Sequence, residues 1–220
     1  MRHFEEELEE LKRKLLEMSG LVESAVHSSV RVLAEQSSEK AQEVLENERR
    51  INRIEIAIDD DATRLLALQQ PLAVDLRFVK AAIKINNNLE RMGDLAVNIV
   101  HRAQSLMSQR PVRPLVDLPH MAALVEAMVG KSLDAFVRRD AALAGSVLAS
   151  DDAVDELRDT IFVELTRMIQ AEPDATPQCV NLMFIARCLE RIADHATNIA
   201  EEVFFFVEGV DVRHHAREDG

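Results

Sequence analysis

Carboxylate side chains recur at helical spacing along this sequence. Glu90 and Asp94 are four residues apart, and Asn98 follows four residues later. A helix turns by about 100° per residue, so side chains at positions i, i+4 and i+8 lie along one slowly drifting stripe. The stripe therefore lines one helix face with oxygen donors. The same three residue types recur 100 positions later, as Glu190, Asp194 and Asn198.

Two further acidic pairs precede these stripes. Glu55 and Asp59 are four residues apart, as are Asp155 and Asp159. Like charges at this spacing cost a helix about 0.2–0.5 kcal/mol per pair. Nevertheless, both positions are acidic in all four pairs of the two repeats. Two interpretations are open: the acids form solvated helix faces, or they bind cations.

The cation interpretation depends on how the helices pack. If the helices that carry successive pairs are antiparallel neighbours, their acidic flanks share a groove. Two carboxylates about 6 Å apart repel by roughly 3 kcal/mol at an effective dielectric of about 20, and a multivalent ion would relieve this repulsion. Oxygen-only ligands suit Mg²⁺, Mn²⁺, Ca²⁺ or iron. We therefore predict one metal site with the ligands Glu55, Asp59, Glu90, Asp94 and Asn98, and a second with Asp155, Asp159, Glu190, Asp194 and Asn198.

Basic side chains beside the stripes have two interpretations each. Arg91 and Arg191 lie about 100° from the acidic stripes, where each either pairs with an acid or holds an anion bound to the metal. His101 could add a nitrogen ligand one turn after Asn98, although a capping or surface role is the simpler interpretation. The sequence assigns no role to His214, His215, Cys179 or Cys188.

The elements that position these residues are predicted to be helices. The chain has 220 residues, of which only six are Gly and six are Pro, and 47% are hydrophobic. So few turn residues argue against sandwiches, barrels and doubly wound sheets. Asp140 is a predicted helix cap. The predicted fold class is all-α, with prolines or caps delimiting six helices at 3–36, 38–70, 74–108, 117–138, 140–171 and 175–208.

The constant offset of 100 residues indicates an internal duplication. It relates both the acidic residues and apolar positions of the third and sixth predicted helices, such as Ile85 with Ile185 and Leu89 with Leu189. Repetition at a fixed period is the signature of duplicated structural units. We expect two three-helix units, 1–108 and 109–220, the second ending in a frayed or disordered tail over 209–220.

The charge balance excludes several classes of partner. With 26 basic and 39 acidic residues, the formal net charge is −13, and such a surface repels phosphate backbones of nucleic acids. No apolar run approaches the roughly 20 residues of a spanning helix, and the first residues lack the apolar segment of a signal peptide. We expect a soluble cytoplasmic protein that binds no nucleic acid and does not insert into membranes.

The repeated motif resembles that of the PhoU family. The segments Glu90-Arg91…Asp94…Asn98-Ile99 and Glu190-Arg191…Asp194…Asn198-Ile199 carry the resemblance, together with the acidic pairs before them and the segment Leu65–Pro71. The resemblance implies two three-helix bundles related by a pseudo-twofold axis, with multinuclear iron or zinc clusters on the acidic pairs. It also implies a homodimer that negatively regulates phosphate uptake and the phosphate regulon. The implied partners are the ATPase subunit of the phosphate ABC transporter and a sensor kinase.

Two alternative functions are considered beside this one. The acids could belong to an enzyme with a carboxylate-bridged metal centre, but the Glu-x-x-His motif of ferritin-like di-iron sites is absent from the sequence. The chain could also be a structural helical adaptor whose acids are solvated. We therefore expect a regulator without catalytic activity of its own.

Overall fold

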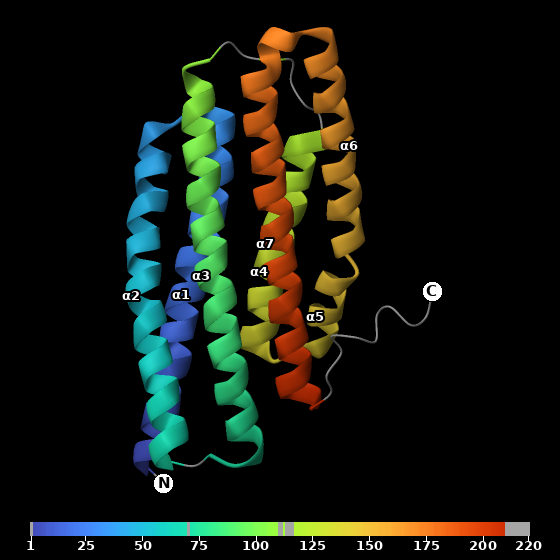
Figure 1. The fold of residues 1–220 in the computed structure, drawn as a ribbon. Helices are drawn as coiled ribbons and strands as arrows, with labels where there is room; N and C mark the ends of the chain where they lie inside the picture. Colours follow the sequence, from blue (N-terminus) through green and yellow to red (C-terminus); the bar gives the residue numbers. More distant parts are fainter. Residues whose placement is uncertain (1, 70, 110–111, 113–116, 210–220) are drawn as a thin grey trace.

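The protein is almost entirely helical. The computed structural model describes residues 2–69, 71–109, 112 and 117–209, and in this part of the chain it contains no strand. The elements, drawn in Figure 1, are α1 (Arg2–Glu35), α2 (Ser38–Gln69), α3 (Ala73–Met107), α4 (Asp117–Arg138), α5 (Ala141–Leu148), α6 (Asp151–Ala171), the 3₁₀ helix η1 (Pro173–Ala175) and α7 (Thr176–Glu208).

The predicted fold class is confirmed, and the helix limits agree within a few residues except in the fifth helix. The single helix predicted over 140–171 is wrong in detail, because two turn residues, Ala149 and Ser150, divide it into α5 and α6. Asp151 and Asp152 then open α6, where carboxylates favour the positive end of the helix dipole. The predicted cap is confirmed: Asp140 Oδ1 accepts a 2.9 Å hydrogen bond from the amide of Leu143. Apart from Gly209, the predicted tail lies outside the described residues.

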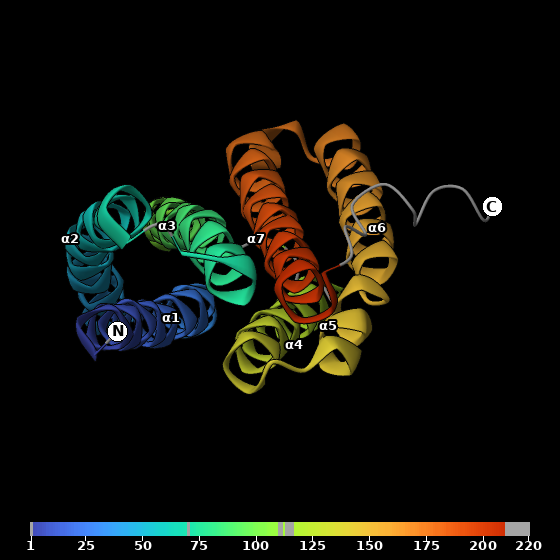
Figure 2. The same cartoon turned by 90° about the horizontal axis from the view of Figure 1, so that it is seen from below.

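The helices form two bundles side by side. Figure 2 shows α1, α2 and α3 in one bundle and α4, α5, α6 and α7 in the other, with α5 and α6 together in the place of one helix. The helices α3 and α7 lie next to each other between the bundles, and α2 and α6 lie at the outer edges. The helices α1 and α4 lie together on one side of this layer.

The contacts between α3 and α7 reveal the twofold relation. Lys84 pairs with Glu202 at 2.5 Å, Asn88 Oδ1 accepts from Asn198 at 3.3 Å, and Arg102 lies over the ring of Phe184 at 4.4 Å. In each pair the two residue numbers add up to 286, so the helices run antiparallel. The position 100 residues after Lys84 is Phe184, and the position 100 residues before Glu202 is Arg102, so the internal repeat exchanges the first pair with the third. The pseudo-twofold axis that relates the repeats therefore passes near Gly93 and Ala193.

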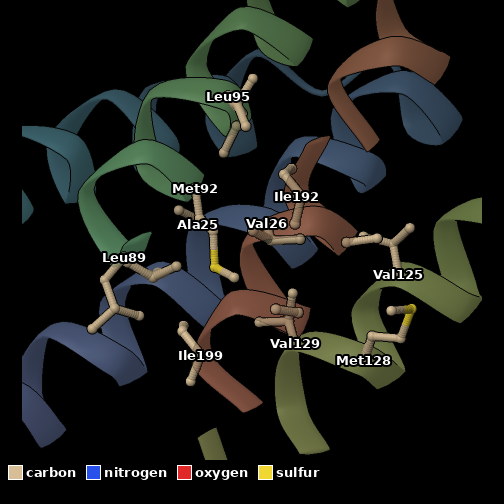
Figure 3. Close-up of a cluster of buried hydrophobic side chains, with 14 of the residues drawn as sticks. Ala25, Val26, Leu89, Met92, Leu95, Val125, Met128, Val129, Ile192 and Ile199 are labelled. Carbon is tan, nitrogen blue, oxygen red and sulfur yellow. The ribbon is translucent and has the colours of Figure 1, made fainter. Parts of the chain in front are cut away.

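An apolar core joins the two bundles. Figure 3 shows Met92 of α3 and Ile192 of α7 among side chains from α1 and α4. Both residues are completely buried. Burial of apolar area stabilises the folded state by about 25 cal/mol per Å². The two units therefore stabilise each other, because part of the core of each is supplied by its neighbour.

No helix among the described residues is both long enough and apolar enough to cross a membrane.

Cys179 and Cys188 are both free; Cys179 is buried and Cys188 is half-buried. Burial raises the pKa of both thiols, which keeps them in the less reactive protonated form.

Candidate metal centre

The packing of α2 against α3 brings the first acidic residues together. Asn86 donates a 3.1 Å hydrogen bond to the backbone oxygen of Glu55. Further along, a Cβ on Gly93 would lie 3.1 Å from Cδ1 of Ile51, so the helices approach closely here and a larger residue would require the Ile51 side chain to shift. These contacts fix an antiparallel register that places Glu55 level with Glu90.

The first carboxylate cluster consists of Glu55, Glu90 and Asp94. Burial raises the pKa of Glu90, and the negative charges of Asp94 and Glu55 raise it further, whereas Arg91 opposes the shift. Arg91 lies 3.4 Å from Glu90 and 3.7 Å from Asp94 with a side chain that is 62% exposed, so it pairs loosely with acids of its own helix. The three carboxylates thus interact unfavourably when all are charged.

Two residues predicted for the first site lie away from this cluster, and an unpredicted one lies beside it. Asp59 is exposed and sits one helical turn beyond Glu55, away from Asp94. Asn98 is also exposed and lies one helical turn beyond Asp94 on α3. Asn52 follows Ile51, which lies against Gly93, so the register places Asn52 near the level of Met92, between Glu90 and Asp94 along α3. Its Oδ1 atom is buried without a hydrogen-bond partner, while its amide donates to Glu48.

The second carboxylate cluster lies between α6 and α7 and has four members. Burial raises the pKa of Glu190, and the negative charge of Asp194 adds to the shift. Partial desolvation and the charge of Asp155 raise the pKa of Asp194, although both aspartates lie at the exposed edge of the cluster. Asp151 belongs to the same cluster, because burial and the charges of Asp194 and Asp155 raise its pKa as well. The duplication argument misses Asp151, since its counterpart 100 residues earlier is the buried Ile51.

Two arginines enter the second cluster. Arg158 lies 3.0 Å from Glu190 Oε1 and 2.9 Å from Asp159 Oδ1, and Arg187 lies 2.8 Å from the same Glu190 oxygen. Asp159 is an exposed partner of Arg158. Asn198 faces α3 and donates to Asn88 Oδ1 at 3.3 Å, which places it in the seam between the bundles and outside the cluster.

The side chains of both clusters fit a hard cation by type and by unsatisfied atoms. Among the described residues, no three carboxylate, imidazole or thiol groups already surround one point at metal distances. However, Glu190 Oε2 in the second cluster and Asn52 Oδ1 on α2 are buried oxygens without a hydrogen-bond partner, and a water or an ion commonly completes such atoms.

Comparison with known proteins decides the family. The model of the PhoU domain matches this chain twice, over residues 15–103 and 118–203. The chain belongs to the PhoU family. The two matches repeat the division seen in the fold, with one PhoU domain in each bundle.

Relatives of the PhoU family match over nearly the whole chain. The phosphate-specific transport system accessory protein PhoU homologue of Pseudomonas aeruginosa is 42% identical over 212 residues, covering 96% of this chain and 88% of the relative. The homologue of Aquifex aeolicus is 39% identical over 215 residues and covers 97% of each chain.

Solved structures of the family confirm the architecture. The crystal structure of PhoU from P. aeruginosa has a TM-score of 0.90 at 41% identity and covers 94% of this chain and 100% of that one. The phosphate transport system regulatory protein PhoU from Streptococcus pneumoniae has a TM-score of 0.86 at 29% identity, covering 95% and 99%. The arrangement of two three-helix bundles is therefore shared with both proteins.

Proposed function

We propose that this chain is a regulatory accessory protein of phosphate transport. The observation that supports the proposal is the match of both PhoU domains, together with near full-length identity of about 40% to proteins named as accessory components of phosphate-specific transport. Those names describe accessory proteins and no catalytic activity. The chain is therefore proposed to act by binding partners.

The proposed direction of regulation is negative. The chain would restrain phosphate uptake and the phosphate regulon through the ATPase subunit of the phosphate ABC transporter and through a sensor kinase, as a cytoplasmic homodimer. The net charge of −13 supports protein partners over nucleic acid, because an acidic surface repels phosphate backbones. The exposed acidic helices would also suit basic patches on such partners.

Metal binding is the second part of the proposal. Glu55, Glu90 and Asp94 would hold a divalent or trivalent cation in the first bundle, and Asp155, Glu190 and Asp194 would do so in the second. The ion supplies positive charge that removes the repulsion between carboxylates, and it cross-links two helices of each bundle. The raised pKa of Glu90 and the unpaired Oε2 atom of Glu190 support this use of the clusters. Iron or zinc follows from the family resemblance, and Mg²⁺, Mn²⁺ or Ca²⁺ from the ligand type.

Complementation tests the proposed regulation. A P. aeruginosa strain without its own PhoU homologue would receive this chain, and phosphate uptake and expression from a phosphate-regulated promoter would be measured in phosphate-rich medium. We expect the chain to restore repression of both. A folded chain that is produced at normal levels and leaves both readouts derepressed contradicts the proposal. Co-purification with the ATPase subunit or the sensor kinase then identifies the partner.

A further inference from the structure

The two repeats differ at two positions beside their carboxylate clusters. Arg158 of the second repeat corresponds to Ile58 of the first, which lies 100 residues earlier. Arg187 corresponds in the same way to Asn87. Ile58 is completely buried in the core. The first cluster therefore has no counterpart of either arginine, and among the described residues its paired cation is the exposed Arg91.

Arg158 occupies the second cluster with its guanidinium group. Its nitrogens lie 2.9 Å from Asp159, 3.0 Å from Glu190 and 3.7 Å from Asp155, and only 20% of its side chain is exposed. Hydrogen bonds between a guanidinium and carboxylates are among the strongest in proteins. Arg187 adds a 2.8 Å contact to the Glu190 oxygen that Arg158 already binds.

Glu190 shows that the second cluster keeps a free ligand atom in spite of the arginines. Both arginines contact Oε1, whereas Oε2 is buried without a partner in a residue that is only 7% exposed. An incoming cation would find this oxygen available. It would still have to remove Arg158 from Glu190 and Asp155 before it could bind both carboxylates.

We propose that Arg158 is an internal cation that competes with metal ions for the second carboxylate cluster. The first cluster, Glu55 with Glu90 and Asp94, is then the tighter metal site, and the second binds an ion only when Arg158 is displaced. The inference rests on the proposed metal binding, and it makes the two repeats unequal in affinity although their acidic motifs match.

Manganese titration of the full-length chain tests the inference. Mn²⁺ is a suitable probe because it prefers oxygen ligands and its electron paramagnetic resonance signal separates free from bound ion. The informative variant is Arg158→Ile, which introduces the residue of the first repeat, with Arg158→Gln as a second variant that keeps a hydrogen-bond donor. Arg167→Ile is the matched control, because Arg167 is an exposed arginine on the same helix. Circular dichroism verifies that each variant is helical.

The expected results locate each site. In the wild type, Asp94→Asn should remove the tighter Mn²⁺ binding, and Asp194→Asn should leave it unchanged. Arg158→Ile should tighten binding at the second cluster at least about tenfold, which corresponds to ~1.4 kcal/mol, and this gain should disappear with Asp194→Asn. Arg167→Ile should not produce it. Arg158→Gln should produce part or all of the gain.

Other outcomes overturn the inference and can be told apart from failure of the proposed metal binding. If Asp94→Asn and Asp194→Asn weaken Mn²⁺ binding equally, or if folded Arg158 variants show no gain, the inference is wrong while metal binding stands. If no variant binds Mn²⁺, both are wrong. A gain in Arg158→Ile without any binding by the wild type also overturns the inference, because it removes the first cluster as the tighter site.

Discussion

His195 of α7 lies 2.9 Å from the side-chain oxygen of Asn88 on α3, across the seam between the two bundles. Asn198 donates to the same oxygen at 3.3 Å. Burial lowers the pKa of His195, and the charges of Arg191 and Arg91 lower it further, which favours the neutral ring. Asn88 Oδ1 only accepts hydrogen bonds, so this contact favours the tautomer of His195 that is protonated at Nδ1. One asparagine thus connects the bundles through two donors.

Replacement of this asparagine should destabilise the protein. Asn88→Ala leaves His195 partly buried without its partner, and such a loss costs about 1–3 kcal/mol. The free energy of unfolding in urea, measured with a chelator present, gives the effect. The neighbouring exposed Asn87 provides the control, because Asn87→Ala should change stability by less than about 0.5 kcal/mol. Equal effects of the two substitutions would show that the seam hydrogen bonds contribute nothing.

The core at the twofold axis predicts cooperative unfolding. Met92 is completely buried between the bundles, so Met92→Ala should cost about 2–5 kcal/mol. Because the lost contacts belong to both bundles, we expect the wild type and the variant to unfold in one transition. Calorimetry measures this directly. Ile56→Ala, on a side chain that is 60% exposed, should have little effect. Two separate transitions in the wild type would contradict a shared core.

The fold could be predicted in most respects because its signals are local and repeated. Few turn residues, well-placed prolines and the offset of 100 residues predict the helices and the duplication. The break at Ala149 and Ser150 is weaker in the sequence. A serine followed by two aspartates is a helix-start signal, but neither glycine nor proline marks the end of α5. The apolar core shared by the bundles could not be predicted, because the helical period shows which face of a helix is apolar but not which helix it packs against.

The candidate site could be predicted only in part because helix spacing does not give the register between helices. Glu55, Glu90 and Asp94 lie together as expected, whereas Asp59 lies a turn away. The drift of 40° per step in the i, i+4 stripe explains why Asn198 faces α3 instead of the acids. Arg158 was not identifiable as a member of the second cluster, since only the packing of α6 on α7 brings it to Glu190.

The cap of α5 offers a local stability test. Asp140 Oδ1 accepts the amide of Leu143 at 2.9 Å, and loss of an aspartate cap costs about 0.5–2 kcal/mol. We therefore expect Asp140→Ala to lower the free energy of unfolding by about 1 kcal/mol. Asp134→Ala is the comparison, because Asp134 is exposed and only pairs with Arg138 one turn away. A smaller loss for Asp140→Ala than for Asp134→Ala would argue against the cap.

Glu90 should impose a characteristic pH dependence on the metal-free protein. Burial together with Asp94 and Glu55 raises its pKa above the ordinary value of 4.5, in spite of Arg91. A carboxyl group with a raised folded-state pKa stabilises the fold at low pH and loses this contribution as pH rises through that value. The stability of Glu90→Gln relative to wild type should therefore increase between pH 4 and pH 7. Urea unfolding at several pH values measures it, and a constant difference would contradict the raised pKa.

Metal addition should stabilise the wild type through Asp94. An ion that binds only the folded state adds RT ln(1 + [L]/Kd), or about 2.7 kcal/mol at 100 times Kd. Mn²⁺ should therefore raise the melting temperature, and a chelator should reverse the change. Asp94→Ala removes a ligand and also one repelling charge near Glu90. This variant should lose the gain from Mn²⁺ while its metal-free form is unchanged or slightly more stable. Asp134→Ala should keep the full gain. If Asp94→Ala matches wild type with Mn²⁺ present, Asp94 does not bind the ion.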